Sequence, residues 1–120
     1  MKIETSNGDI LDKISILMIK SERITDEQKL KNINNELIEL SPCLLELADF
    51  FEIFEDLKAT NESLWDIENK IREKEIQKCF DEDFIELARS VYKYNDERAR
   101  LKRLINLQSE SNFIEEKSYT

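Results

Sequence analysis

The near absence of glycine and proline limits the possible folds of this chain more than any other feature. Its 120 residues include one glycine and one proline, and 38% of them are charged residues that recur at helical spacing. Folds rich in β-strands depend on tight turns that favour glycine, so this sequence lacks residues that such folds need. We therefore expect an all-α protein.

Capping signals divide the chain into predicted helices. Ser6 is expected to cap a first helix that runs to about Arg23, and Thr25 is expected to cap a short second helix. Ser41 and Pro42 predict the start of a third helix, because proline is tolerated at the first helical position.

The two helices nearer the C-terminus are predicted to be long. No glycine or proline follows Pro42, so we expect one helix as far as Cys79, with a kink near Thr60 permitted but not forced. Asp81 is expected to cap a fourth helix that ends near Leu107.

The remaining residues, 109–120, lose the helical period and are expected to form a docked or flexible tail. The length of the chain suits one domain, residues 1–120. The predicted fold is a four-helix antiparallel arrangement with two long C-terminal helices and a short C-terminal tail.

The charge of the chain limits its partners. Eighteen basic and 27 acidic residues give a net charge of −9, which opposes binding to nucleic acid and to anionic membranes. No stretch approaches the roughly 18 apolar residues of a membrane span, and the amino terminus has no apolar signal region, so we expect a cytoplasmic protein.

The cysteines are too few for a disulfide scaffold. Cys43 and Cys79 are the only two, and the chain has no histidine to complete a common zinc site. We expect both thiols to be reduced, and a straight third helix would hold them too far apart for a disulfide.

A densely apolar segment predicts self-association. Nine of the fourteen residues from Leu44 to Leu57 are apolar, including Phe50, Phe51 and Phe54. We expect this segment to be the most enclosed part of the fold, and part of its surface to meet a second copy of the chain. The sequence thus predicts a homodimer.

Polar residues interrupt the apolar faces of both long helices. In the predicted fourth helix, polar side chains share a face with Val91 and Ile105. In the predicted third helix, polar side chains share a face with Leu57 and Leu64. We call the interrupting residues the polar seam: Asn61, Glu68, Arg72, Glu75, Asn95, Arg98 and Lys102. Buried polar groups are costly unless they satisfy one another, so the seam is either a structural feature or a site.

Two functions fit the polar seam. In the first, its acidic members pair with its basic members, and the protein is a non-enzymatic binding or assembly module that needs no cofactor. In the second, Glu68 and Glu75 hold Mg²⁺ while the other members orient a small anionic ligand. That alternative is a magnesium-dependent enzyme acting on a phosphorylated small molecule, as all-helical nucleotide pyrophosphohydrolases do.

Other acidic pairs give weaker support to the enzyme hypothesis. Carboxylates spaced by three residues occur at Glu36 with Glu39 and at Glu52 with Glu55. A chain with 27 acidic residues produces such pairs readily by chance, and a magnesium site needs oxygen ligands from several helices. The absence of histidine also removes the usual base for activating a serine or cysteine nucleophile.

Four runs of the sequence resemble a small family of bacterial and phage proteins that is described as a domain of unknown function. They are GDILDKISILMIKSERI (8–24), LKATNESLWDIENKIREKE (57–75), FDEDFIELARSVYKYNDERARLKRLIN (80–106) and EEKSY (115–119). The resemblance spans nearly the whole chain. It implies a compact helical protein and supplies no activity, cofactor or catalytic residue.

Several polar positions inside these runs coincide with the polar seam. The polar positions are Asp12, Lys13, Lys20, Asn61, Glu68, Arg72, Arg89, Tyr92, Asn95, Asp96 and Arg98. The agreement directs attention to the seam without naming a reaction.

Overall fold

The structure, a computed structural model, describes residues 5–109. Within this range the chain forms four α-helices, which are α1 (Asn7–Arg23), α2 (Glu27–Glu46), α3 (Phe51–Gln77) and α4 (Glu82–Gln108). A 3-10 turn, Ala48–Phe50, joins α2 to α3, and no strand occurs in the described range. The all-α prediction is confirmed, whereas the tail predicted beyond Ser109 lies outside the described residues.

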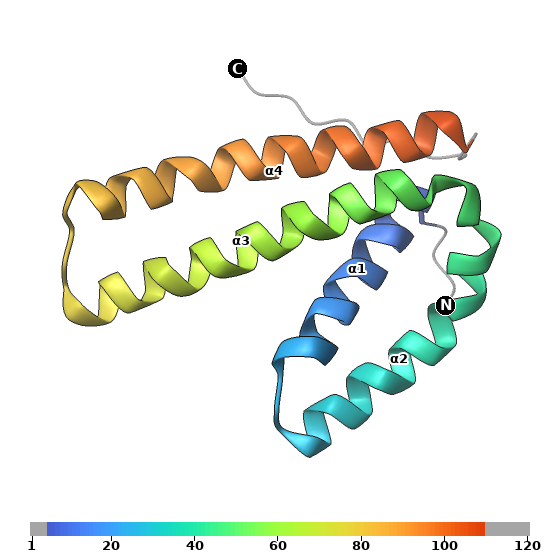
Figure 1. The fold of residues 1–120 in the computed structure, drawn as a ribbon, viewed down its shortest axis with the longest axis horizontal. Helices are drawn as coiled ribbons and strands as arrows, with labels where there is room; N and C mark the ends of the chain where they lie inside the picture. Colours follow the sequence, from blue (N-terminus) through green and yellow to red (C-terminus); the bar gives the residue numbers. More distant parts are fainter. Residues whose placement is uncertain (1–4, 110–120) are drawn as a thin grey trace.

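The helices form two hairpins that share one core (Figure 1). α1 and α2 make the first hairpin, α3 and α4 make the second, and α1 packs against all three other helices. The centre of the core consists of six buried side chains, two from each of three helices: Leu11, Ile14, Phe54, Leu57, Leu101 and Ile105. We call the part of the molecule formed by α1, α2 and the segments of α3 and α4 that pack against α1 the base. None of the described helices is long and apolar enough to cross a membrane.

Side-chain caps begin three of the helices. The Ser6 hydroxyl accepts the N–H of Asp9 at 3.1 Å, and the Asp81 carboxylate accepts the N–H of Phe84 at 3.0 Å, as the sequence predicts for α1 and α4. α2 begins one residue later than expected, with Asp26 rather than Thr25 as its cap. Local side-chain chemistry therefore sets these boundaries.

The predicted break between the second and third helices at Pro42 is wrong. α2 continues through Pro42, which has no N–H for the carbonyl of Ile38 one turn earlier. The hydroxyl of Ser41 donates to that carbonyl at 2.9 Å and replaces the missing bond. The chain turns instead at Ala48–Phe50, and α3 then runs without a break through Thr60.

The prediction that the segment 44–57 is the most enclosed part of the fold is also wrong. Phe54 and Leu57 are buried, but Leu45 is 78% exposed and Phe51 is 52% exposed. The turn splits the segment between two helices, so only the part that belongs to α3 reaches the centre of the core.

Beyond the base, α3 and α4 continue side by side as a two-helix arm, which we define as residues 65–100 (Figure 1). None of these 36 residues is buried. The radius of gyration is 16.1 Å, whereas a compact domain of this size has a radius of about 13 Å. The molecule is therefore a compact base that carries an extended arm.

Candidate functional site

Asp12 of α1 lies at the centre of the polar contacts between the helices. Its side chain is only 8% exposed. Arg98 of α4 donates to it through Nε, 2.8 Å from Oδ1, and through a terminal nitrogen to Oδ2. Asn61 of α3 donates through Nδ2 to Asp12 Oδ1 at 2.9 Å and to Ser15 Oγ at 2.8 Å. We call these four residues the Asp12 network, and it joins α1, α3 and α4 through mutually satisfied groups.

A second ion pair lies farther along α4. Lys102 Nζ is 2.9 Å from Asp9 Oδ1, and the Lys102 side chain is only 12% exposed. Nearby, the N–H of Gly8 donates to Asn106 Oδ1 at 2.6 Å. A β-carbon on Gly8 would lie 2.5 Å from the carbonyl oxygen of Lys102, so only glycine lets the start of α1 approach α4 this closely.

The end of α4 is tied to the start of α1 by two amide side chains. Asn7 Nδ2 donates to Ser109 Oγ at 2.9 Å, and Asn106 accepts from Gly8. The Asn106 side chain is buried, and its Nδ2 has no hydrogen-bond partner in the described range. These contacts hold the two helices together and leave one amide donor unsatisfied.

The structure divides the polar seam into two groups. Three members contact side chains of α1, near the junction of the base and the arm: Asn61, Arg98 and Lys102. Three others are exposed on the arm: Glu68, Arg72 and Glu75. Asn95 is half-buried on α4. The predicted pairing within the seam is wrong, because the carboxylates that bind Arg98 and Lys102 belong to Asp12 and Asp9.

Reasoning from the two long helices missed these acidic partners. Asp12 and Ser15 stand beside the buried Leu11 and Ile14 and interrupt the apolar face of α1. The same kind of interruption identified the seam on α3 and α4. Asp12 is also among the polar positions that the family resemblance singled out, so a signal for it was present in the sequence.

The carboxylates considered for magnesium do not gather into a site. All six are exposed on helix surfaces: Glu36, Glu39, Glu52, Glu55, Glu68 and Glu75. Over residues 5–109, no three acidic or cysteine side chains are grouped so that they could hold a metal ion. A hard cation needs several oxygen ligands from converging elements, and these carboxylates do not provide them.

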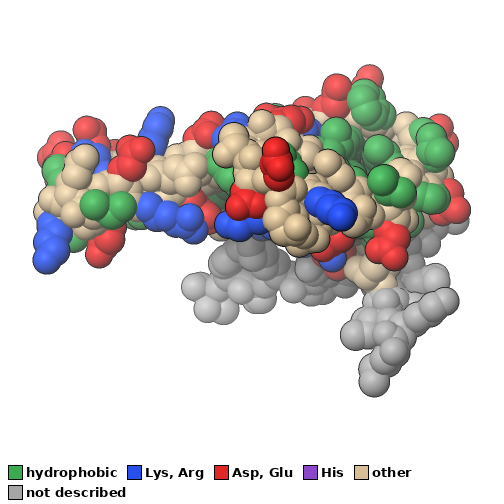
Figure 2. Space-filling model, turned by 90° about the horizontal axis from the view of Figure 1, so that it is seen from below, with side chains coloured by type: hydrophobic (Ala, Val, Ile, Leu, Met, Phe, Trp, Pro, Cys, Tyr) green, Lys and Arg blue, Asp and Glu red, His purple; other side chains and the backbone are tan. Residues whose placement is uncertain are grey.

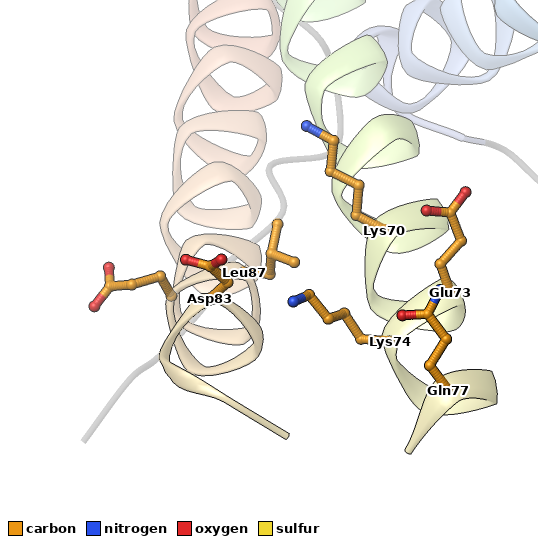
Figure 3. Close-up of a pocket in the computed structure, with 7 residues that line it drawn as sticks. Lys70, Glu73, Lys74, Gln77, Asp83 and Leu87 are labelled. Atoms are coloured by element: carbon orange, nitrogen blue, oxygen red, sulfur yellow. The ribbon is translucent and has the colours of Figure 1, made fainter. Parts of the chain in front are cut away.

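A groove of about 380 Å³ lies between α3 and α4 near the tip of the arm (Figure 3). Its lining residues are Lys70, Glu73, Lys74, Gln77, Asp83, Glu86 and Leu87. Figure 3 shows Lys70 and Lys74 extending from α3 toward α4. Two lysines and three carboxylates line the groove, so it has no strong preference for ligands of either charge.

One ion pair holds the turn at the tip of the arm. Lys74 Nζ lies 2.9 Å from Asp81 Oδ2. The hydrogen bond from Lys74, together with the N–H of Phe84, lowers the pKa of Asp81 to about 2, and the same bond raises the pKa of Lys74. Lys78 ends α3 in the left-handed conformation, with φ of 52°. The connection between the arm helices is therefore fixed by electrostatics and a helix cap.

The base carries an exposed surface that is both apolar and acidic. Ile38, Leu45 and Phe51 are 71%, 78% and 52% exposed. Residues 32–57, which contain all three, include seven acidic residues and no basic one. We call the exposed surface of residues 32–57 the acidic patch. Figure 2, which views the molecule from below, shows apolar side chains gathered at the right-hand end, where α2 and the 3-10 turn lie.

Comparison with known proteins identifies a family but no activity. All of residues 1–120 match the model of a family described as "Family of unknown function (DUF6165)". This match confirms the resemblance to a family of unknown function. No curated protein and no solved structure matches the chain.

Proposed function

The chain belongs to DUF6165, a family of unknown function, and we propose that it is a non-enzymatic binding module. Its partner is a protein segment that carries both basic and apolar side chains, and the acidic patch is the surface that receives it. The module acts in the cytoplasm, where the two unpaired thiols, Cys43 and Cys79, remain reduced.

The composition of the acidic patch is the observation that carries this proposal. Large apolar side chains exposed together on a monomer are typical of protein interaction sites. Residues 32–57 hold seven carboxylates and no lysine or arginine, and Lys13 of α1 pairs with one of them, Glu36, so the surface keeps a net negative field that attracts basic partners and repels acidic ones. A basic amphipathic helix presents both properties that this surface complements.

The contacts that residues of the polar seam make within the chain favour a binding role over catalysis. An enzyme gathers polar groups around a cavity that its substrate enters. Here Arg98 and Lys102 already bind carboxylates of the same chain, and Asn61 donates to Asp12 and Ser15. These groups hold the helices together and are not presented to a small anionic ligand.

A labelled helical peptide of lysine and leucine residues, with all lysines on one face, tests the proposal by fluorescence anisotropy. We expect micromolar affinity that weakens as salt rises. Leu45→Glu adds a negative charge and removes an apolar contact, so docking on the patch predicts that the affinity for the peptide falls about tenfold. Simple attraction between opposite charges predicts that the affinity rises. A rise or no change in affinity would overturn the proposal.

A matched variant on the arm completes the experiment. Ile76 is 81% exposed, close to the exposure of Leu45, but lies on α3 outside the acidic patch. Ile76→Glu adds the same charge and is expected to bind the peptide at least as tightly as the wild type. An equal loss for both variants would show that the patch is not the binding surface.

Thermal melting tests the magnesium-dependent alternative. A ligand at about 100 times its dissociation constant stabilises the native state by about 2.7 kcal/mol, which raises Tm by several degrees. We expect Mg²⁺ with a panel of nucleotides to leave Tm unchanged. A rise in Tm that Glu68→Gln abolishes, and that is retained by Glu27→Gln, an exposed carboxylate outside the candidate pairs, would favour the enzyme.

A further inference from the structure

We propose that the arm is the contact surface for a second copy of this chain, with the two arms packed antiparallel about a two-fold axis near Ala88 and Arg89. In the resulting dimer, α4 of one copy lies antiparallel to α4 of the other. This inference is independent of the peptide-binding role of the base.

The first argument is that, within residues 5–109, no further element covers the arm beyond its root, where Arg23 and Asp12 of α1 contact Asp66 and Arg98. A helix pair has to bury its apolar stripe against another element to be stable, and most helix stability comes from such packing. The base meets this need because α1 covers the long hairpin, whereas no residue between 65 and 100 is buried. Apolar residues of the arm remain only half-buried, among them Phe84, Leu87 and Val91.

The second argument is an exposed stripe along α4. Ile85, Ala88, Arg89 and Tyr92 fall within about 100° of one another at 100° per residue, and all four are exposed. Ile85 is 51% exposed and Tyr92 is 53% exposed. The small side chain of Ala88 lies between them, where it permits close approach of another helix.

The third argument is the charge of the arm. Residues 65–100 hold eight basic and ten acidic side chains, a net charge of −2, so the rest of the chain carries −7 of the total of −9. Two arms therefore meet with little net repulsion. Apposing two acidic patches would instead bring fourteen carboxylates together, of which only Glu36 of each copy has a lysine partner, Lys13, among the ion pairs of the described residues, so the patch is a poor surface for a second copy.

The order of charges along α4 sets the orientation of the pair. Residues 81–86 include four acidic side chains and no basic one, whereas residues 87–95 include Arg89 and Lys93 and no acidic one. In an antiparallel pair with its axis between Ala88 and Arg89, residues 81–86 of one copy face residues 91–96 of its partner, which hold one lysine, Lys93, and one carboxylate, Asp96. A parallel pair would instead set the four carboxylates of each turn against those of the other. A two-fold axis between Ala88 and Arg89 also sets Ile85 against the partner's Tyr92.

Sedimentation equilibrium of the full chain tests this inference. We expect a dimer at tens of micromolar protein that persists at high salt, because apolar burial does not weaken when charges are screened. Ile85→Glu should weaken the dimer at least about a hundredfold, since the two-fold axis uses the site twice. Tyr92→Glu should act in the same direction.

The matched control is Leu45→Glu, which adds the same charge to an exposed apolar position of the base. It should change dimerisation by no more than about threefold, which is about 0.6 kcal/mol. A wild type that stays monomeric would overturn the arm–arm dimer and leave the binding role of the base intact. A dimer that Leu45→Glu dissociates and Ile85→Glu does not would place the interface on the base and also overturn the inference.

A charge exchange tests the antiparallel orientation. Lys93→Glu should weaken the dimer, because the glutamate introduced at this position has the same negative charge as the acidic turn of the partner that it faces. Adding Glu86→Lys should restore it, since each copy again presents opposite charges to the other. In a parallel pair, each of these positions would face the same position of the partner, and the second substitution would not restore an attractive contact. A double variant that dimerises no better than Lys93→Glu alone would therefore refute the antiparallel arrangement.

Discussion

Replacing Arg98 by alanine is expected to destabilise the protein, because Asp12 would remain buried and lose its cation. Arg98 supplies two charge-assisted hydrogen bonds to a carboxylate whose side chain is 8% exposed. After the substitution, Asn61 is the one side chain of the Asp12 network that still donates to this carboxylate. The variant thus tests whether the network stabilises the base.

The size of the effect follows from the burial of the pair. Removing one partner of a fully buried ion pair costs about 3–5 kcal/mol. The Arg98 side chain is 31% exposed, so water can reach the vacated position and reduce that cost. We expect a loss of about 2–3 kcal/mol, which lowers Tm by roughly 8–12 °C at about 4 °C per kcal/mol for a domain of this size.

Urea denaturation followed by far-UV circular dichroism measures this loss. The set is the wild type, Arg98→Ala, Asp12→Ala and the double variant, all at the same protein concentration. If the two side chains interact as the structure indicates, the double variant should lose about 1–3 kcal/mol less than the sum of the single losses. Glu68→Ala, an exposed position of the arm, should stay within about 0.5 kcal/mol of the wild type. A loss for Arg98→Ala no greater than for Glu68→Ala would refute the reasoning.

Three further predictions concern other contacts. Gly8→Ala should destabilise by about 1–3 kcal/mol in urea, because the new methyl group would force α1 away from the carbonyl of Lys102; an unchanged midpoint would contradict the close approach. The pKa of Asp81 is about 2 in the fold against an ordinary value of 3.8, so its stabilisation is complete above pH 3.8 and disappears as pH falls through 2. Asp81→Ala should therefore lower Tm at neutral pH and not near pH 2, as calorimetry can measure. Mild oxidation should give no fast-migrating monomer on a non-reducing gel, because Cys43 lies in α2 at the base and Cys79 follows α3 at the tip of the arm.

Helix starts that depend on a nearby side chain were predictable from the sequence. Ser6 and Asp81 each lie three residues before the N–H that they accept, so the signal is contained within one turn of chain. The continuity of α3 through Thr60 was predictable for the same reason, since nothing local interrupts it.

The turn between α2 and α3 was not predictable. Neither the 3-10 turn nor α3 has a side-chain cap, and the obvious breaker, Pro42, is accommodated by the hydroxyl of Ser41. Leu47, directly before the turn, and Phe50, its last residue, pack against the core. Long-range packing, which no local pattern reports, therefore decides where α2 ends.

The polar seam was predictable in part. Asn61, Arg98 and Lys102 stand out because each interrupts an apolar stripe of its own helix. Their partners could not be found in the same way, because Asp9 and Asp12 belong to α1, whose position relative to α4 depends on the whole fold. Periodicity identifies which side chains need a partner, and topology decides which partner each receives.

The position of the Asp12 network at the root of the arm has a mechanical consequence. The network ties α3 and α4 to α1 at Asn61 and Arg98, and α4 reaches from Arg98 back to Glu82 beyond that point. Sixteen residues of helix span about 24 Å at about 1.5 Å per residue. A tilt of about 10° at the network therefore displaces the tip by about 4 Å over this length. Together with the ion pair between Arg23 of α1 and Asp66 of α3, the Asp12 network therefore sets the angle at which the arm leaves the base, so small changes in these polar contacts move the tip of the hairpin by several ångströms.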